Sequence, residues 1–199
     1  MKIAVRATEK QKAEWLSKAT AGNIEISWVT TDIPAADAYF DLLFEEMDPL
    51  FAAVQDRPVF VSGVLTTLQQ LPPNVSRINA WNGFIARDTI EVVLREGASA
   101  ILEALGWKYR EVPDVPGMIA ARAISMIISE AYFAWGEGVS SKEDIDTAMK
   151  LGTNYPYGPF EWSEKIGLHL FYRLLRCLAA TDERYQPAPA MEQELKAIA

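Results

Sequence analysis

The sequence predicts an α/β chain in two parts, a short and mostly parallel β-sheet over residues 1–112 and an all-helical domain over residues 113–199. In the first part, short apolar strands alternate with helix-length segments, which is the pattern of parallel strands joined by crossover helices. A long apolar helix dominates the second part. Between them, residues 113–117 contain two prolines and a glycine, and this break marks the predicted boundary.

Strands of the first part are predicted at residues 2–6, 24–30, 39–44, 76–84 and 108–112, and at the start of 57–68. Thr8 with Gln11 forms a capping box for a helix that runs to about Ala19, with Trp15, Leu16 and Ala19 directed inward. A short helix is expected to end at residues 54–55, and another to follow the strand within 57–68.

The segment 88–105 allows two structures. As one helix, Asp88 and Glu91 form a capping pair, and apolar residues follow at helical spacing. As a strand and a helix, residues 89–94 pair into the sheet and Gly97 precedes the helix. The β-branched residues of 89–94 and the presence of Gly97 favour the second structure.

The helical part opens with residues 118–135, which are apolar except for Arg122, Ser125, Ser129 and Glu130. Such a helix must be buried on most of its circumference, and its charges argue against a membrane span. Gly136 and Gly138 end it. Ser140 with Glu143 then predicts a capping box for a helix to about residue 151, with Gly152 in the left-handed position beyond it.

Three further features complete the helical part. Pro159 suits the first turn of a third helix, a fourth is expected over residues 168–180, and Pro187 is expected to begin the last one.

Composition limits the function classes. The net charge of −8 and the pI of about 4.8 argue against a nucleic-acid partner or an anionic membrane, which would require a basic patch. Cys177 is the only cysteine, so no internal disulfide forms, and no His and Cys cluster offers metal ligands. The N-terminus turns charged after a few residues and is not a signal peptide, so a cytoplasmic location is expected.

Three segments carry a family resemblance: VPGMIAARAISMIISEA, EGVSSKEDIDTAMKLG and YPYGPFEWSEKIGL. They resemble the C-terminal helical domain of the 3-hydroxyacyl-CoA dehydrogenase family. ADAYFDLLFEEMDPL is similar to the fourth strand region of that family's nucleotide-binding sheet. The resemblance implies a reduced Rossmann-like domain over 1–112, NAD-dependent chemistry on a 3-hydroxyacyl-CoA, and a homodimer through the helical domain. The apolar excess of residues 118–135 also favours such an interface.

The cofactor turn departs from the family pattern. A Rossmann domain binds the pyrophosphate at a glycine-rich turn after its first strand. Here residues 6–11 contain no glycine, and Glu9 brings negative charge toward the phosphate position. Arg6 and Lys10 could in principle compensate a phosphate, but an ordinary capped helix start is the favoured interpretation. Asp32 follows the second strand as a weak candidate for the ribose-binding acid. We therefore expect no cofactor-binding residues, and NAD only if the chain is an active dehydrogenase.

The catalytic positions also differ. The family places its general base in His-Phe-Phe-Asn-Pro, and the matching residues here are 79–83. Asn79 stands at the histidine position, Asn82 retains the asparagine and Gly83 replaces the proline. The family's orienting glutamate maps to Glu91, twelve residues after Asn79, provided that 89–94 is a strand. The only histidine, His169, lies in the helical part and is expected at a surface or interface.

Two more family positions concern substrate binding. The asparagine that holds the substrate carbonyl corresponds to Ala121, and the family's Ser-Asn-Thr-Ser-Ser corresponds to residues 62–66, of which Ser62 and Thr66 keep their hydroxyls. The candidate site is thus Asn79 and Glu91 at the catalytic positions with Ser62 and Asn82 as substrate-binding residues.

Three functions fit these observations. The chain is a degenerate family member without NAD-dependent turnover that binds an acyl-CoA-like ligand or a protein partner. Alternatively, it is an active 3-hydroxyacyl-CoA dehydrogenase with an atypical site. In a third interpretation, Glu91, Asn79 and Asn82 form the polar site of a different enzyme on the same scaffold.

Overall fold

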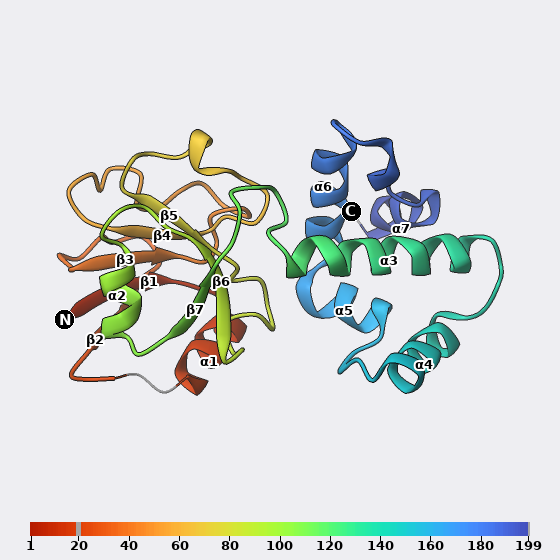
Figure 1. Cartoon of the computed structure of the whole chain (residues 1–199), viewed down its shortest axis with the longest axis horizontal. Coiled ribbons are helices and arrows are strands. Elements are labelled where there is room, and N and C mark those ends of the chain that lie inside the picture. The colour runs from red at the N-terminus through yellow and green to blue at the C-terminus, as the bar shows by residue number, and fades with distance from the viewer. Residues whose placement is uncertain (19–20, 199) are drawn as a thin grey trace. The chain divides into compact units, whose positions relative to one another are not determined.

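The computed structural model describes residues 1–18 and 21–198 (Figure 1). The chain divides into two compact units, Met1–Met118 and the residues from Ile119 onward. Sequence placed the boundary a few residues earlier, at 113. No helix among the described residues is long and apolar enough to cross a membrane.

A seven-stranded sheet with the order β2-β1-β3-β4-β5-β6-β7 forms the centre of the N-terminal unit (Figure 1). All neighbouring strands run parallel except β5 and β6, so the predicted mostly parallel sheet is confirmed. The strands are β1 Lys2–Arg6, β2 Glu25–Trp28, β3 Ala38–Asp41, β4 Val59–Ser62, β5 Val75–Ile78, β6 Thr89–Val93 and β7 Lys108–Glu111.

One face of the sheet is covered by the helices α1 Glu9–Ser17 and α2 Ser99–Ala104. Trp15 of α1 is fully buried and contacts Phe40 and Trp107 edge to face. The capping box of Thr8 and Gln11 is present as predicted. Leu16, predicted to point inward, is 61% exposed, because the buried positions of this short helix are Gln11 and Trp15, four residues apart on one face. Ala19 lies outside the described residues.

Irregular segments cover the opposite face. Phe51 is buried against Tyr39, Val59 and Val75 of this face. The helix predicted to end at 54–55 is absent, because residues 42–53 form turns around the carboxylate of Asp41, which accepts from the amides of Leu43 and Leu50. The helix predicted within 57–68 is also absent, since only a 3₁₀ turn, Leu68–Gln70, follows β4. The strand predicted at 76–84 ends at Ile78, before the turns that follow.

The two structures left open for residues 88–105 are resolved in favour of a strand and a helix. Residues 89–93 form β6, which pairs antiparallel with β5 and parallel with β7. Gly97 has the positive φ of +78° that begins the turn toward α2. The strand forms because its β-branched residues are buried between two partners.

Arg77 of β5 ties the end of the N-terminal unit to its sheet. Its side chain is fully buried, forms an ion pair with Asp114, and donates to the carbonyl oxygens of Gly63 (2.8 Å) and Val115 (3.1 Å). Burial lowers the pKa of Arg77, and the hydrogen bond that Arg77 donates to Asp114 opposes this shift. The segment that resembles a linker in the sequence is therefore packed into the N-terminal unit, which continues to Met118.

The helical unit is built on α3 Ala120–Gly136, which packs against three other helices (Figure 1). Its remaining helices are α4 Lys142–Thr153, α5 Pro159–Ile166, α6 Leu168–Ala179 and α7 Pro189–Ile198, with a 3₁₀ turn at Glu183–Tyr185. The long apolar helix and Pro159 in the first turn of α5 are confirmed.

Asp146 explains the sequence around the α4–α5 connection. Its buried carboxylate accepts from the amides of Phe160 (2.8 Å) and Glu161 (3.1 Å), so α4 caps α5. A Cβ atom at Gly158 would lie 2.3 Å from the Asp146 carboxylate. The connection therefore requires an acid at position 146 and glycine at 158.

Three predicted helix ends are corrected. Ser141, not Ser140, caps α4, because its hydroxyl accepts from the Asp144 amide three residues on. Gly152 lies inside α4, which continues to Asn154 in the left-handed conformation at φ 55°. The last helix begins at Pro189 and not at Pro187.

Candidate functional site

The candidate site lies at the edge of the sheet where the parallel strands β1, β3, β4 and β5 have their carboxyl ends. In open parallel sheets, ligands bind in the crevice outside these ends. Ser62 is the last residue of β4, Asn79 directly follows β5, and Asn82 lies in the next turn. Glu91 stands on β6 beside them.

Asn79 and Glu91 are adjacent. The Asn79 amide nitrogen of the backbone donates to the Glu91 carbonyl oxygen at 2.9 Å, and its Nδ2 donates to Glu91 Oε2 at 3.4 Å. Asn79 is 1% exposed, and its Oδ1 is buried without a hydrogen-bond partner among the described residues. β5–β6 pairing thus brings together the two positions that the sequence assigned to a catalytic pair.

Ser62, at the end of β4, and Asn82, in the turn after β5, are the other two predicted site residues. Ser62 is 2% exposed, so its hydroxyl offers little surface to a substrate. Asn82 is half-buried. Among the other positions, Ala121 is buried in α3 and His169 is exposed at the start of α6, both in the helical unit.

A buried ion pair joins the carboxyl ends of the neighbouring strands β1 and β3. Arg6 ends β1, Asp41 ends β3, and two side-chain hydrogen bonds of 2.7 Å join them. Their side chains are 6% and 1% exposed. The sequence allowed Arg6 to bind a phosphate, but in the structure its guanidinium binds Asp41. Glu9 and Lys10 are exposed at the start of α1, and Asp32 is exposed after β2.

Gln11 links three segments at the same edge. Its Nε2 donates to the carbonyl oxygens of Leu42 and Ala80, both at 3.0 Å. Its Oε1 accepts from the Thr8 amide at 2.9 Å, while the Gln11 amide donates to Thr8 Oγ1 at 3.1 Å. The start of α1 is therefore fastened to the loops that follow β3 and β5.

Two glutamates that sequence reasoning missed complete the edge. Glu45 accepts from the Leu65 amide at 2.5 Å and from Trp81 Nε1 at 3.1 Å. Glu14 of α1 accepts from the Gly83 amide at 2.6 Å. Both bind partners far along the chain, so nothing in their local sequence indicates this role. Within residues 1–18 and 21–198, no group of three His, Cys, Asp or Glu side chains is arranged to hold a metal ion.

Comparison with known proteins supports the resemblance of the helical unit. Residues 117–198 match the family profile described as 3-hydroxyacyl-CoA dehydrogenase, C-terminal domain. The 3-hydroxyadipyl-CoA dehydrogenase of Escherichia coli K12 is 44% identical over 94 residues, which are 46% of this chain and 20% of that protein. A probable 3-hydroxybutyryl-CoA dehydrogenase of Bacillus subtilis is 36% identical over 100 residues, 49% of this chain and 35% of that protein. The matched segments thus span about a third or less of either relative.

A solved structure extends the comparison to the fold of the whole chain. The (S)-3-hydroxybutyryl-CoA dehydrogenase of Ralstonia eutropha is similar with a TM-score of 0.77, over 98% of this chain and 93% of that one. At 18% identity this likeness concerns the fold alone. The sequence match to the 3-hydroxyacyl-CoA dehydrogenase family is therefore a match of the helical unit, to the C-terminal domain of that family.

Proposed function

We propose that this chain is a family member without NAD-dependent turnover, which acts as a binding protein for an acyl-CoA-type ligand or for a protein partner. One observation carries the proposal. Side-chain contacts of Arg6 with Asp41 and of Gln11 with the loop after β3 occupy the edge of the sheet at which a Rossmann domain binds its cofactor.

The turn after β1 does not fit a dinucleotide. Pyrophosphate binding needs a close backbone approach and free amide groups at a helix N-terminus. Here side chains replace the glycines, and the capping box uses the amides of Thr8 and Gln11 internally. Glu9 adds a negative charge at the same turn. These contacts support the loss of NAD binding.

The position of the general base supports the loss of chemistry independently. Asn79 donates and accepts hydrogen bonds but does not titrate, so it cannot take a proton as imidazole does. It is also almost fully buried. A hydroxyl group of a substrate would have no titrating partner at this position.

The helical unit supports the binding role that remains. It keeps the family sequence over residues 117–198, including the Asp146 connection to α5. We include in the proposal a homodimer formed through this unit. Several of its large apolar side chains are exposed, among them Val139 and Leu151.

One observation favours the second candidate, an active dehydrogenase with an atypical site. The carboxylate of Glu91 lies 3.4 Å from Asn79 Nδ2 and is half-buried, so it stands next to the position of the family base. Glu91 would then be the general base, in this reaction or in a different one on the same scaffold.

Calorimetric titration of the whole chain with NADH, and separately with acetoacetyl-CoA, tests the proposal. We expect no saturable NADH binding at ligand concentrations up to about 1 mM, which corresponds to roughly −4 kcal/mol. The acetoacetyl-CoA titration should saturate. A micromolar dissociation constant for NADH would overturn the proposal and favour the active dehydrogenase.

A further inference from the structure

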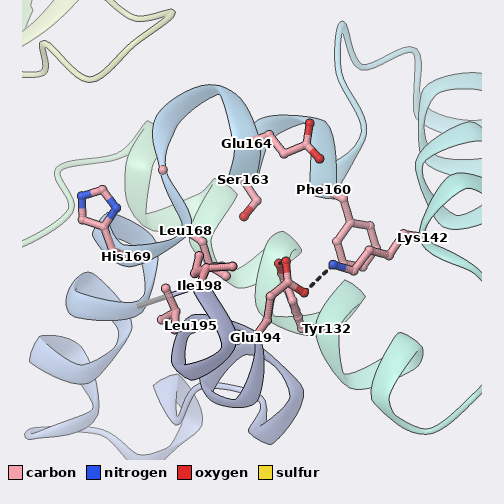
Figure 2. Close-up of a pocket in the computed structure, with 11 residues that line it drawn as sticks. Tyr132, Lys142, Phe160, Ser163, Glu164, Leu168, His169, Glu194, Leu195 and Ile198 are labelled. Atoms are coloured by element: carbon pink, nitrogen blue, oxygen red, sulfur yellow. Dashed lines mark hydrogen bonds and ion pairs between the residues drawn. The ribbon is translucent and has the colours of Figure 1, made fainter. Parts of the chain in front are cut away.

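The helical unit contains a cavity of about 470 Å³ (Figure 2). Tyr132 of α3, Ser163 of α5, Leu168 at the start of α6, and Glu194 and Leu195 of α7 contribute to its lining. The volume is in the range of small-molecule sites. None of the residues at the sheet edge takes part in this cavity.

An ammonium group is already held at one end of the cavity. Nζ of Lys142 lies 4.3 Å from the ring centre of Trp135, 5.1 Å from that of Phe160 and 5.3 Å from that of Tyr132. Aromatic faces attract cations at these distances. The same Nζ forms an ion pair with Glu194, as Figure 2 shows. This end of the cavity therefore has the chemistry of an ammonium site, occupied by a side chain of the protein itself.

The charge of the lining favours a cation over an anion. Glu164 and Glu194 are two carboxylates against the single ammonium of Lys142, in a chain of net charge −8. The hydroxyl of Tyr132 donates to Glu194 Oε1 at 3.1 Å. Burial raises the pKa of Tyr132, so this hydroxyl stays protonated and holds the carboxylate in place.

Besides the polar side chains of Ser163, Glu164 and His169, the lining includes an apolar group. Leu168, Leu195 and Ile198 lie together on the side away from Lys142 in Figure 2. Ile198 is 71% exposed, so this side is open to solvent. An aliphatic chain placed there would bury apolar surface that is now partly hydrated.

We propose that this cavity binds an organic cation, an ammonium group that carries a short aliphatic chain. The ammonium contacts Tyr132, Phe160 and Glu194, and the chain contacts Leu168, Leu195 and Ile198. Lys142 is the internal occupant that the ligand displaces, and its side chain, already 29% exposed, moves into solvent. The inference does not depend on whether the chain binds NAD or turns over a substrate.

Calorimetry of the whole chain with three ligands of equal chain length tests the class of ligand. We expect hexyltrimethylammonium to bind saturably, hexanol to bind about 10-fold more weakly because it lacks the cation–π and ion-pair contributions, and hexanoate to show no saturable binding. No saturable binding of the cation, or equal binding of the alcohol, would overturn the proposal.

Two substitutions that break the same ion pair distinguish a role of Lys142 and Glu194 in ligand binding from a purely structural role. Lys142→Met removes the internal occupant and leaves Glu194 for the ligand, so affinity for the cation should rise about 3-fold to 10-fold. Glu194→Gln removes the partner of the ligand, so affinity should fall about 10-fold or more. If the pair only holds α4 to α7, both variants lower affinity together, and the proposal is wrong.

A matched control exists in the same unit. Lys150 and Glu161 form an ion pair whose side chains are 36% and 38% exposed, close to the 29% and 25% of Lys142 and Glu194. Lys150→Met should leave the affinity unchanged. Circular dichroism verifies folding, and Lys142→Gln replaces Lys142→Met if the latter does not fold.

Discussion

The two units of this protein differ in how their sequences compare with the 3-hydroxyacyl-CoA dehydrogenase family. The N-terminal unit is a mostly parallel sheet of buried strands. The helical unit matches the profile of the family's C-terminal domain over residues 117–198. A sheet of this kind needs only buried apolar strands in the right order, whereas the α4–α5 connection needs Asp146 and Gly158 specifically. The two units therefore differ in how strictly the fold constrains the sequence.

The largest effect that distinguishes the units concerns turnover. We expect oxidation of 3-hydroxybutyryl-CoA to stay below detection, because the proposed loss of a positioned base costs about 10²–10⁴ in rate and the proposed loss of NAD binding adds to that cost. Asn79→His alone should not restore it, since NAD would still not bind. NADH formation followed by absorbance measures this.

A wild-type rate of about 1 per second or faster would show that the chain is an active 3-hydroxyacyl-CoA dehydrogenase. Glu91→Gln would then be the first variant to make, because Glu91 is the titratable group beside Asn79. Loss of activity in that variant would identify the replacement base.

The next effect concerns the stability contributed by the buried ion pair between β1 and β3. Arg6→Met leaves the buried carboxylate of Asp41 without its ion-pair partner, and should lower the free energy of unfolding by about 3–5 kcal/mol. Lys2→Met breaks the exposed pair with Glu25 on the neighbouring strand, and should cost at most about 1 kcal/mol. Urea unfolding compares the two variants. Equal losses of unfolding free energy would mean that the buried Arg6–Asp41 pair contributes no more to stability than an exposed pair.

A smaller effect concerns the proposed dimer. Light scattering at micromolar concentration should give about twice the monomer mass of 22.2 kDa. Leu151 of the helical unit and Leu16 of the N-terminal unit are both exposed, at 82% and 61%. Leu151→Lys should weaken the dimer by about 1 kcal/mol or more if its surface is part of the interface, and Leu16→Lys should not. A monomer mass for the wild-type chain would count against the dimer.

The smallest effect is a pH dependence within the helical unit. The hydrogen bond from Lys150, followed by that from the Gly158 amide, lowers the pKa of Glu161 below its ordinary value of 4.5. The ionised carboxylate thus stabilises the folded state above that value, and the contribution is lost as the pH falls through the lowered pKa. Because both side chains are partly exposed, the contribution is about 0.2–1 kcal/mol.

Unfolding free energies of the wild type and of Glu161→Gln measure this dependence. The difference between the two proteins should shrink as the medium becomes more acidic than pH 4.5. A difference that stays constant across this range would show that Glu161 contributes nothing through its charge.

Local patterns predicted the elements well. The capping box of Thr8 and Gln11 spans three residues and was identified correctly. The segment 89–93 could not be assigned to a strand from its sequence alone, because the strand is stabilised by pairing with the chain around Asn79, which forms only in the folded sheet. The missing helix after β3 has a similar origin, since the Asp41 carboxylate accepts from the amides of Leu43 and Leu50 in the turns that replace it.

The candidate site was predicted only in part. Its adjacent pair, Asn79 and Glu91, followed from the family resemblance and is adjacent in the structure. The contacts of Arg6 with Asp41 and of Gln11 with Ala80 at this edge were not predicted, because these partners are 35 and 69 residues apart in the sequence. No local pattern reports contacts at such separations, and a charged residue at a strand end suits a ligand as well as an internal partner.

The anchoring of residues 113–117 by Arg77 determines where the chain can be cut into fragments. A fragment that ends at residue 112 keeps the guanidinium in its core but discards Asp114, and it leaves a buried charge without a counter-ion. A fragment that ends at Met118 retains Asp114, the carbonyl of Val115 and the amide of Gly117, which donates to Val64 at 2.7 Å. The prolines and the glycine that resemble a flexible connection are thus the last part of the sheet domain, and an N-terminal half prepared alone must include them.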